Sequence, residues 1–143
     1  MISADVERDL AKLGKVRRIE GASAVENAIA FTRYERGSFG WAITTAGHSF
    51  TVANSDRPLD AAAAAVLTAR GVPSPLLLTD RADELPPALE DYFLNVQPGF
   101  YDDPREVAYS RAWILGDEES VSVKAQIELE KLVDLIPIQE NAP

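Results

Sequence analysis

Residues 54–80, NSDRPLDAAAAAVLTARGVPSPLLLTD, decide the fold of this chain. The five consecutive alanines at 61–65 favour a helix, and their short side chains let that helix lie close to a sheet. Gly71 is a typical helix end. The three leucines at 76–78 form an apolar run typical of a strand covered on both faces. A helix followed by a buried strand is half of a parallel βαβ unit.

The rest of the chain continues this alternation of helix and strand patterns. Apolar periodicity and capping signals predict further helices over residues 3–13, 23–34, 85–96 and 122–132. Short strands are predicted at 16–19, 41–45, 50–53, 112–115 and 135–138, with a loop at 36–40 and an irregular inserted loop at 97–110. The predicted fold class is α/β: a three-layer sandwich with a central, mostly parallel sheet and helices on both faces, Rossmann-like or Toprim-like. Trp41 and Trp113, on predicted strands, are expected in the core.

Composition limits the partners of this chain. A length of 143 residues fits a single domain spanning 1–143. The net charge of −9 argues against nucleic acid, because phosphate binding needs a basic surface. The absence of cysteine rules out disulfides and thiolate metal sites. No apolar run is long enough for membrane insertion, and no nucleotide-binding glycine motif occurs, so no cofactor is expected.

The two ends of the chain match each other. When Ser3 is placed on Ser122, the apolar positions of both predicted helices coincide, and so do the strands that follow them. The matched pairs are Val6 with Ala125, Leu10 with Leu129, Leu13 with Leu132, Val16 with Leu135 and Ile19 with Ile138. Such repeats usually mean stacked units. We therefore expect residues 1–20 to resemble the closing helix and strand of a preceding repeat, within a longer protein.

A set of motifs in fixed order resembles a known family. The motifs are Ile19-Glu20-Gly21, Asn54-Ser55-Asp56, Leu59-Asp60 with the alanine run, Pro75-Leu76-Leu77-Leu78-Thr79, Leu85-Pro86, and Ile114-Leu115-Gly116 to Val121-Ser122. In this order they are similar to the bacterial cell-wall-binding repeats of type 2, over most of residues 2–132. The resemblance implies a non-catalytic anchoring module of a secreted cell-envelope protein, extracellular and cell wall-associated. Its partners would be a cell-wall polymer or neighbouring repeat domains, with a homo-oligomer as a further expectation.

The best candidate for a ligand site is the turn after the predicted strand 50–53. Crevices in open α/β sheets form at the carboxyl ends of strands, where helix N-termini also lie. The candidate residues are Asn54, Ser55, Asp56, Asp60, Gly116 and Asp117. The alternative is purely structural: Ser55 and Asp56 cap the alanine helix, and Asp60 complements its dipole. A solvated acidic turn is likewise the structural alternative to a cation site at residues 117–119 and at 102–103, and no metal site is predicted.

Two further features of the sequence bear on function. Phe100 and Tyr101 lie between polar turns, where they would form a partner surface or fold back over the sheet edge. His48, the only histidine, sits in a predicted turn, and no Gly-x-Ser-x-Gly elbow accompanies it. The leading hypothesis is therefore a non-enzymatic binding module that acts by tandem stacking or self-association. A small-ligand-binding α/β domain is the first alternative, and a hydrolase or transferase of unrecognised type the second.

Overall fold

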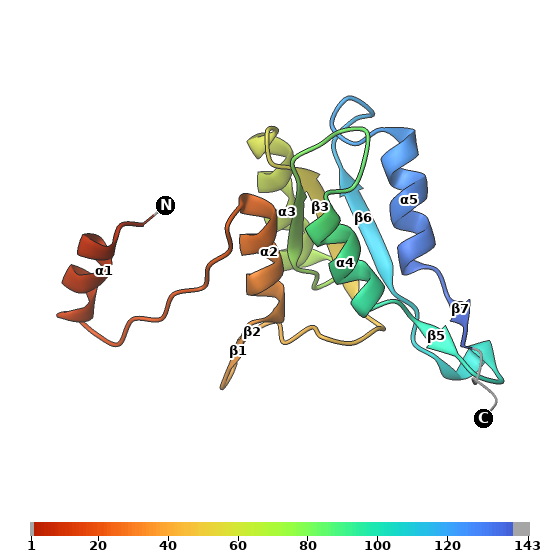
Figure 1. Cartoon of the computed structure of the whole chain (residues 1–143), viewed down its shortest axis with the longest axis horizontal. Coiled ribbons are helices and arrows are strands. Elements are labelled where there is room, and N and C mark those ends of the chain that lie inside the picture. The colour runs from red at the N-terminus through yellow and green to blue at the C-terminus, as the bar shows by residue number, and fades with distance from the viewer. Residues whose placement is uncertain (1, 139–143) are drawn as a thin grey trace.

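The computed structural model of the chain describes residues 2–138. Figure 1 shows a sheet with helices on both sides, and an N-terminal arm (residues 2–20) that stands apart from them. Within the described residues, the helices are α1 (Ala4–Ala11), α2 (Ala24–Arg33), α3 (Pro58–Arg70), α4 (Pro87–Asn95), α5 (Val123–Val133) and a 3-10 turn, η1 (Pro104–Glu106). The strands are β1 (Glu35–Arg36), β2 (Phe39–Gly40), β3 (Ser49–Asn54), β4 (Leu76–Thr79), β5 (Gly99–Phe100), β6 (Arg111–Leu115) and β7 (Ile136–Pro137).

The central sheet has three parallel strands in the order β4-β3-β6. Val52 lies opposite Leu77 on one side and Ile114 on the other. The middle strand β3 is covered on both faces, since its residues from Phe50 to Asn54 are all buried. The predicted class, an α/β sandwich with a parallel sheet and helices on both faces, is confirmed.

The main core lies on one face of this sheet. Phe50, Val52 and Leu77 pack there against α2, α4 and α5, and the ring of Phe50 meets the rings of Tyr92 and Phe93 edge-on at 5.9 and 5.2 Å. Helix α3 lies on the other side of the sheet, against β3 and β6 (Figure 1). Ala64 is the buried residue of α3, where its small side chain permits close approach to the strands.

The chain changes direction at the carboxyl end of β3. Helix α3 leads from β3 to one neighbouring strand, β4, and α4 then leads past β3 to the other neighbour, β6. Helix α3, which follows β3, lies on one face of the sheet, whereas α4 and α5, which follow β4 and β6, lie on the other. Such a reversal is the place where open α/β sheets form a crevice.

Two of the predicted strands are wrong. Residues 16–19 belong to no strand of the described structure, and residues 41–45 do not join the sheet. Instead, the N–H groups of Ala42 and Ile43 donate to the carbonyl oxygens of Tyr34 and Thr32 at the end of α2. Ala42 has a left-handed φ of 55°, which no regular strand allows. The prediction of a loop at 36–40 is also only partly right, because β1 and β2 form a small hairpin there that turns at Gly37.

Smaller corrections concern α3 and the two tryptophans. The N-cap of α3 is Arg57, which makes no side-chain cap, so Ser55 and Asp56 do not cap the helix. Gly71 ends α3 with a φ of −116°, outside the left-handed region expected of a glycine cap. Trp113 is exposed because β6 is an edge strand, whereas Trp41 packs partly against the core. Strand β4 is also an edge strand, and only Leu77 of its three leucines is fully buried.

Candidate functional site

Some of the predicted ligand residues meet at the carboxyl ends of β3 and β6. We name Asn54, Arg57, Asp60, Asp117 and Ser120 the β3–β6 cluster. Asn54 ends β3, Arg57 and Asp60 open α3, and Asp117 and Ser120 belong to the turn between β6 and α5. The structure therefore brings together side chains that lie up to 66 residues apart in the chain.

Asn54 is the centre of this cluster and is buried. Its Nδ2 donates to the carbonyl oxygen of Ser120 at 2.8 Å, and its Oδ1 accepts from the N–H of Asp56 at 2.9 Å. One side chain therefore fixes both the turn after β3 and the turn after β6. A buried amide with donor and acceptor both satisfied stabilises the fold, since an unsatisfied one would be costly.

Ser120 and Arg57 connect the two carboxylates of the cluster. The Ser120 hydroxyl donates to Asp117 Oδ1 at 2.9 Å and lies 3.4 Å from Asp60 Oδ2. Arg57 contacts Asp117 Oδ2 at 3.3 Å and Asp60 Oδ2 at 3.6 Å. The hydrogen bond from Ser120, with a smaller contribution from the charge of Arg57, lowers the pKa of Asp117 below its ordinary value.

Gly116 is required by the geometry of this turn. Its φ is +118°, a conformation that residues with a side chain rarely adopt. A Cβ atom at this position would also lie 2.7 Å from Cβ of Ser120 and 3.0 Å from Oδ2 of Asp60. The glycine thus lets the β6–α5 turn approach the start of α3.

Three of the six residues predicted as a ligand site, Asn54, Asp60 and Asp117, belong to the cluster, and two members of the cluster were not predicted. Arg57 and Ser120 carry no motif of their own, and only the packing of the two turns shows that they contact the predicted carboxylates. Asp56 is exposed, and Ser55 contributes a backbone N–H that donates to the carbonyl of Thr79 at 2.8 Å. The polar groups of Asn54 and Ser120 are used within the chain. A ligand would have to displace Ser120 or Arg57 to reach Asn54.

Phe100 and Tyr101 lie at the opposite end of the domain from this cluster. Phe100 is half-buried in β5, which pairs in parallel with β7, and its carbonyl accepts from the N–H of Ile138 at 2.7 Å. Tyr101 is 65% exposed. Within residues 2–138, no group of three or more His, Asp or Glu side chains has the geometry of a metal site. No helix in the same range is long and apolar enough to cross a bilayer.

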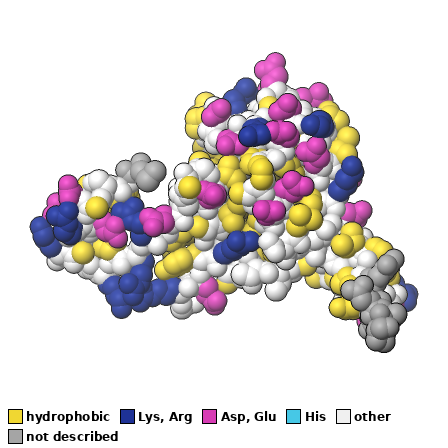
Figure 2. Space-filling model, viewed as in Figure 1, with side chains coloured by type: hydrophobic (Ala, Val, Ile, Leu, Met, Phe, Trp, Pro, Cys, Tyr) yellow, Lys and Arg dark blue, Asp and Glu magenta, His cyan; other side chains and the backbone are white. Residues whose placement is uncertain are grey.

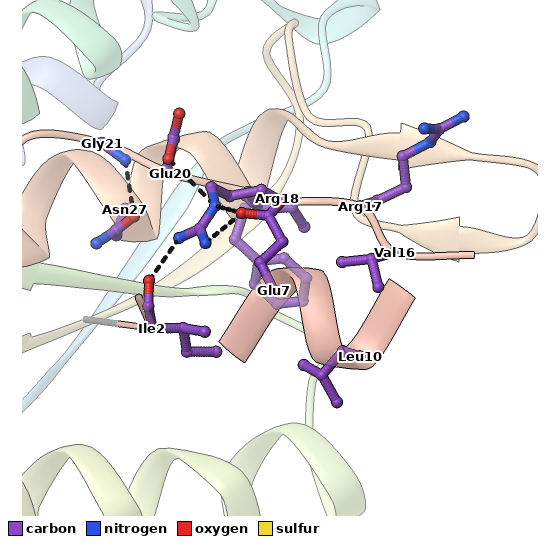
Figure 3. Close-up of a pocket in the computed structure, with 11 residues that line it drawn as sticks. Ile2, Glu7, Leu10, Val16, Arg17, Arg18, Glu20, Gly21 and Asn27 are labelled. Atoms are coloured by element: carbon purple, nitrogen blue, oxygen red, sulfur yellow. Dashed lines mark hydrogen bonds and ion pairs between the residues drawn. The ribbon is translucent and has the colours of Figure 1, made fainter. Parts of the chain in front are cut away.

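A third feature is the hollow between the N-terminal arm and α2, with a volume of about 520 Å³. Arg18 lies at its centre, where it pairs with Glu7 and donates to the carbonyl of Ile2 at 3.1 Å (Figure 3). These contacts fold the arm back on itself, so that Leu10 and Val16 line the same hollow. Figure 2 shows Lys and Arg side chains gathered on this arm, with Asp and Glu among them, and Asp and Glu spread over the body of the domain.

Comparison with known proteins identifies the fold. No family model and no curated protein sequence match the chain. Among solved structures, the chain is similar to Cwp6 from Clostridium difficile, with a TM-score of 0.58 and 21% identity over 86% of this chain. It is also similar to Cwp8 from the same organism, with a TM-score of 0.61 and 19% identity over 99% of this chain. The chain spans 16% of Cwp6 and 20% of Cwp8, so the likeness is to one part of each of these cell wall proteins.

Proposed function

We propose that this chain is a non-catalytic binding or anchoring module of a secreted bacterial cell-envelope protein. It would act outside the cell, at the wall, through stacking with neighbouring units of the same fold or through self-association. The observation that carries the proposal is the fold likeness to parts of Cwp6 and Cwp8, which are cell wall proteins. The ordered motifs add to it, and membership of the type 2 repeat family is part of the proposal.

The arrangement of polar side chains supports a binding role over a catalytic one. The β3–β6 cluster holds its serine between two carboxylates, whereas a nucleophilic serine needs a neighbouring base such as histidine. His48 lies before β3, at the amino end of that strand, whereas the cluster lies at its carboxyl end. A hydrolase activity that disappears in His48→Ala would overturn the non-enzymatic assignment.

Co-sedimentation with isolated cell walls tests the proposal directly. The chain, and two complete copies of it joined head to tail, would be mixed with walls of a Gram-positive bacterium before and after acid extraction of the secondary polymers. We expect the protein to sediment with intact walls, more strongly as two copies than as one, because linked units raise the effective concentration. Equal sedimentation with extracted walls, or none with intact walls for either form, would contradict the proposal.

A pair of tyrosine variants locates the binding surface. Tyr101 and Tyr109 are exposed to a similar degree, but only Tyr101 belongs to the expected partner surface. We expect Tyr101→Ser to reduce sedimentation with intact walls several-fold and Tyr109→Ser to leave it unchanged, because an exposed aromatic ring contributes by stacking on a partner. Equal effects of the two substitutions would remove Phe100 and Tyr101 from the interface.

The alternative of a small-ligand domain is favoured by one observation. The β3–β6 cluster lies at the reversal point of the sheet, where ligands of open α/β folds usually bind. A panel of small sugars and anions, followed through backbone amide chemical shifts, separates the two functions. Saturable shifts centred on residues 54–60 and 116–120 would favour the ligand domain over the anchoring module.

A further inference from the structure

The apolar side of α1 packs against nothing that buries it. None of the residues of α1 is buried, and Val6 and Leu10 are 49% and 43% exposed. The matching positions of α5, Ala125 and Leu129, are each 1% exposed. Two helices with the same apolar pattern therefore have opposite surroundings within one molecule.

The match between α1 and α5 extends to their caps. Ser3 Oγ accepts from the N–H of Val6 at 3.3 Å, and Ser122 Oγ accepts from the N–H of Ala125 at the same distance. Asp9 takes the position of Glu128, whose carboxylate accepts from the N–H of Leu85 at 3.4 Å. The sequence of α1 thus carries apolar and polar groups equivalent to those that hold α5 against the rest of the domain.

The strand after each helix gives a second, independent correspondence. In β7 and directly after it, the N–H groups of Ile136 and Ile138 donate to the carbonyl oxygens of Pro98 and Phe100, at 3.0 and 2.7 Å. Arg17 and Ile19 hold the corresponding positions and also carry N–H groups. Residues 16–19, which pair with no strand here, would form the same ladder beside a strand like β5.

We propose that residues 3–19 close another α/β unit of this fold, occupying in that unit the place that α5 and β7 occupy in this one. The proposal rests on the proposed function as one unit among stacked units, and it names the physical link between them. The partner is a unit without a closing helix of its own, because in this chain, and in any second copy of it, α5 already fills the place.

Charge also favours such a partner. Residues 1–20 contain five Lys and Arg against four Asp and Glu, whereas the remaining residues contain nine against nineteen. The hollow between α4 and α5 is lined by Glu84, Glu90 and Glu128, with Lys131 beside them. Lys12 takes the position of Lys131 and Asp9 that of Glu128, so the arm would place a cation opposite the counterparts of Glu84 and Glu90 in a unit of similar sequence.

A fusion protein tests the inference in a complete chain. Residues 1–121 of one copy are joined directly to residues 3–143 of a second, so that Ser3 takes the place of Ser122. Trp41→Phe and Trp113→Phe in the second copy make tryptophan fluorescence report on the first unit alone. We expect the first unit to unfold cooperatively in urea. In a second fusion, residues 3–19 of the second copy are replaced by a Gly/Ser linker of equal length. If the first unit unfolds in the same way in both fusions, the inference is overturned.

Two matched substitutions in the linking arm sharpen the test. Leu10 corresponds to buried Leu129, whereas Ala11 corresponds to exposed Glu130. In the fusion, Leu10→Asp should lower the urea midpoint of the first unit by about 1 M or more, and Ala11→Asp should not change it. In the single chain, neither substitution should change the midpoint. Equal midpoints for the two variants in the fusion would contradict the inference.

The fusion test and the wall-binding test can fail independently of each other. A fusion whose first unit folds as expected but does not sediment with walls would contradict the proposed function alone. A single chain that sediments with walls, alongside a fusion whose first unit stays unfolded, would contradict the inference alone.

Discussion

Asn54 illustrates how one residue joins two distant turns. Its amide donates to the turn that precedes α5 and accepts from the turn that precedes α3, and it does both while buried. The sequence marked Asn54 as a turn residue with a capping or binding role. The hydrogen bond to Ser120 gives it a structural role that no local pattern could reveal, because the two residues meet only in the folded chain.

Replacing Asn54 should destabilise the domain. Asn54→Ala leaves the buried carbonyl of Ser120 without its donor, and we expect the free energy of unfolding to fall by about 2 kcal/mol. Urea denaturation followed by fluorescence measures the change. Ser55→Ala, one residue further on and outside the cluster, is the control and should stay within about 0.5 kcal/mol of the parent. Equal losses of unfolding free energy in the two variants would contradict a special role of the Asn54 amide.

Asp117 should contribute to the stability of the domain in a pH-dependent way. Its pKa is lower in the folded state than in the unfolded chain, so its contribution is present above the unfolded pKa and is lost as the pH falls through the folded one. Asp117→Asn should therefore be less stable than the parent near neutral pH, and the difference should shrink below about pH 4. Urea midpoints measured across this range test the sign. A difference that does not depend on pH would contradict it.

At the scale of elements, the alanine run explains how α3 lies on the sheet. Only Ala64 of the run is buried, while Ala63 and Ala65 face solvent. The run therefore serves helix formation along most of its length and close packing at one position. The sequence predicts the helix from the whole run, but it does not say which alanine touches the strands.

A larger side chain should be destabilising at position 64 but not at position 63. Ala64→Leu inserts extra volume between α3 and β3, and we expect it to lower the free energy of unfolding by about 1–3 kcal/mol. Ala63→Leu adds the same side chain on the exposed side of the helix and should change it by less than about 0.5 kcal/mol. Thermal unfolding of the two variants checks the comparison, and similar melting temperatures would show that α3 sits differently on the sheet.

Helices α1, α2 and α5 were predictable because each has both a serine cap and an apolar stripe. Ser3, Ser23 and Ser122 cap α1, α2 and α5 through the bonds that the sequence pattern requires. The short strands were less predictable. Residues 16–19 and 41–45 have strand-like composition, yet strand formation needs a partner, and the partner is chosen by the whole fold rather than by the segment.

At the scale of the whole molecule, the domain body and the arm behave as separate parts. The core of the body draws on α2, α4, α5 and the sheet, and no residue of the arm belongs to it. Arg18 and Glu7 bind the arm to itself. The stability of the body should therefore depend little on the arm.

Deleting residues 2–19 tests this separation. We expect the shortened chain to fold and to unfold within about 1 kcal/mol of the parent, because the deletion removes no core residue. Circular dichroism and urea denaturation give the comparison. The control is a deletion from residue 122 onward, which removes buried Leu129 together with α5 and should abolish cooperative unfolding. If the body is unfolded in the chain that lacks residues 2–19, α1 is part of this domain.

The sequence by itself determined the fold class, the main helices, the strand after the alanine helix and the likeness of the two chain ends. These depend on local periodicity, caps and composition, which a single segment carries. The tertiary structure alone decided that Asn54 binds Ser120, that Arg57 lies between two carboxylates, and that β4 and β6 are edges of a three-stranded sheet. It also decided that α5 is buried while α1 is not, because burial depends on which surface a helix meets and not on the helix alone.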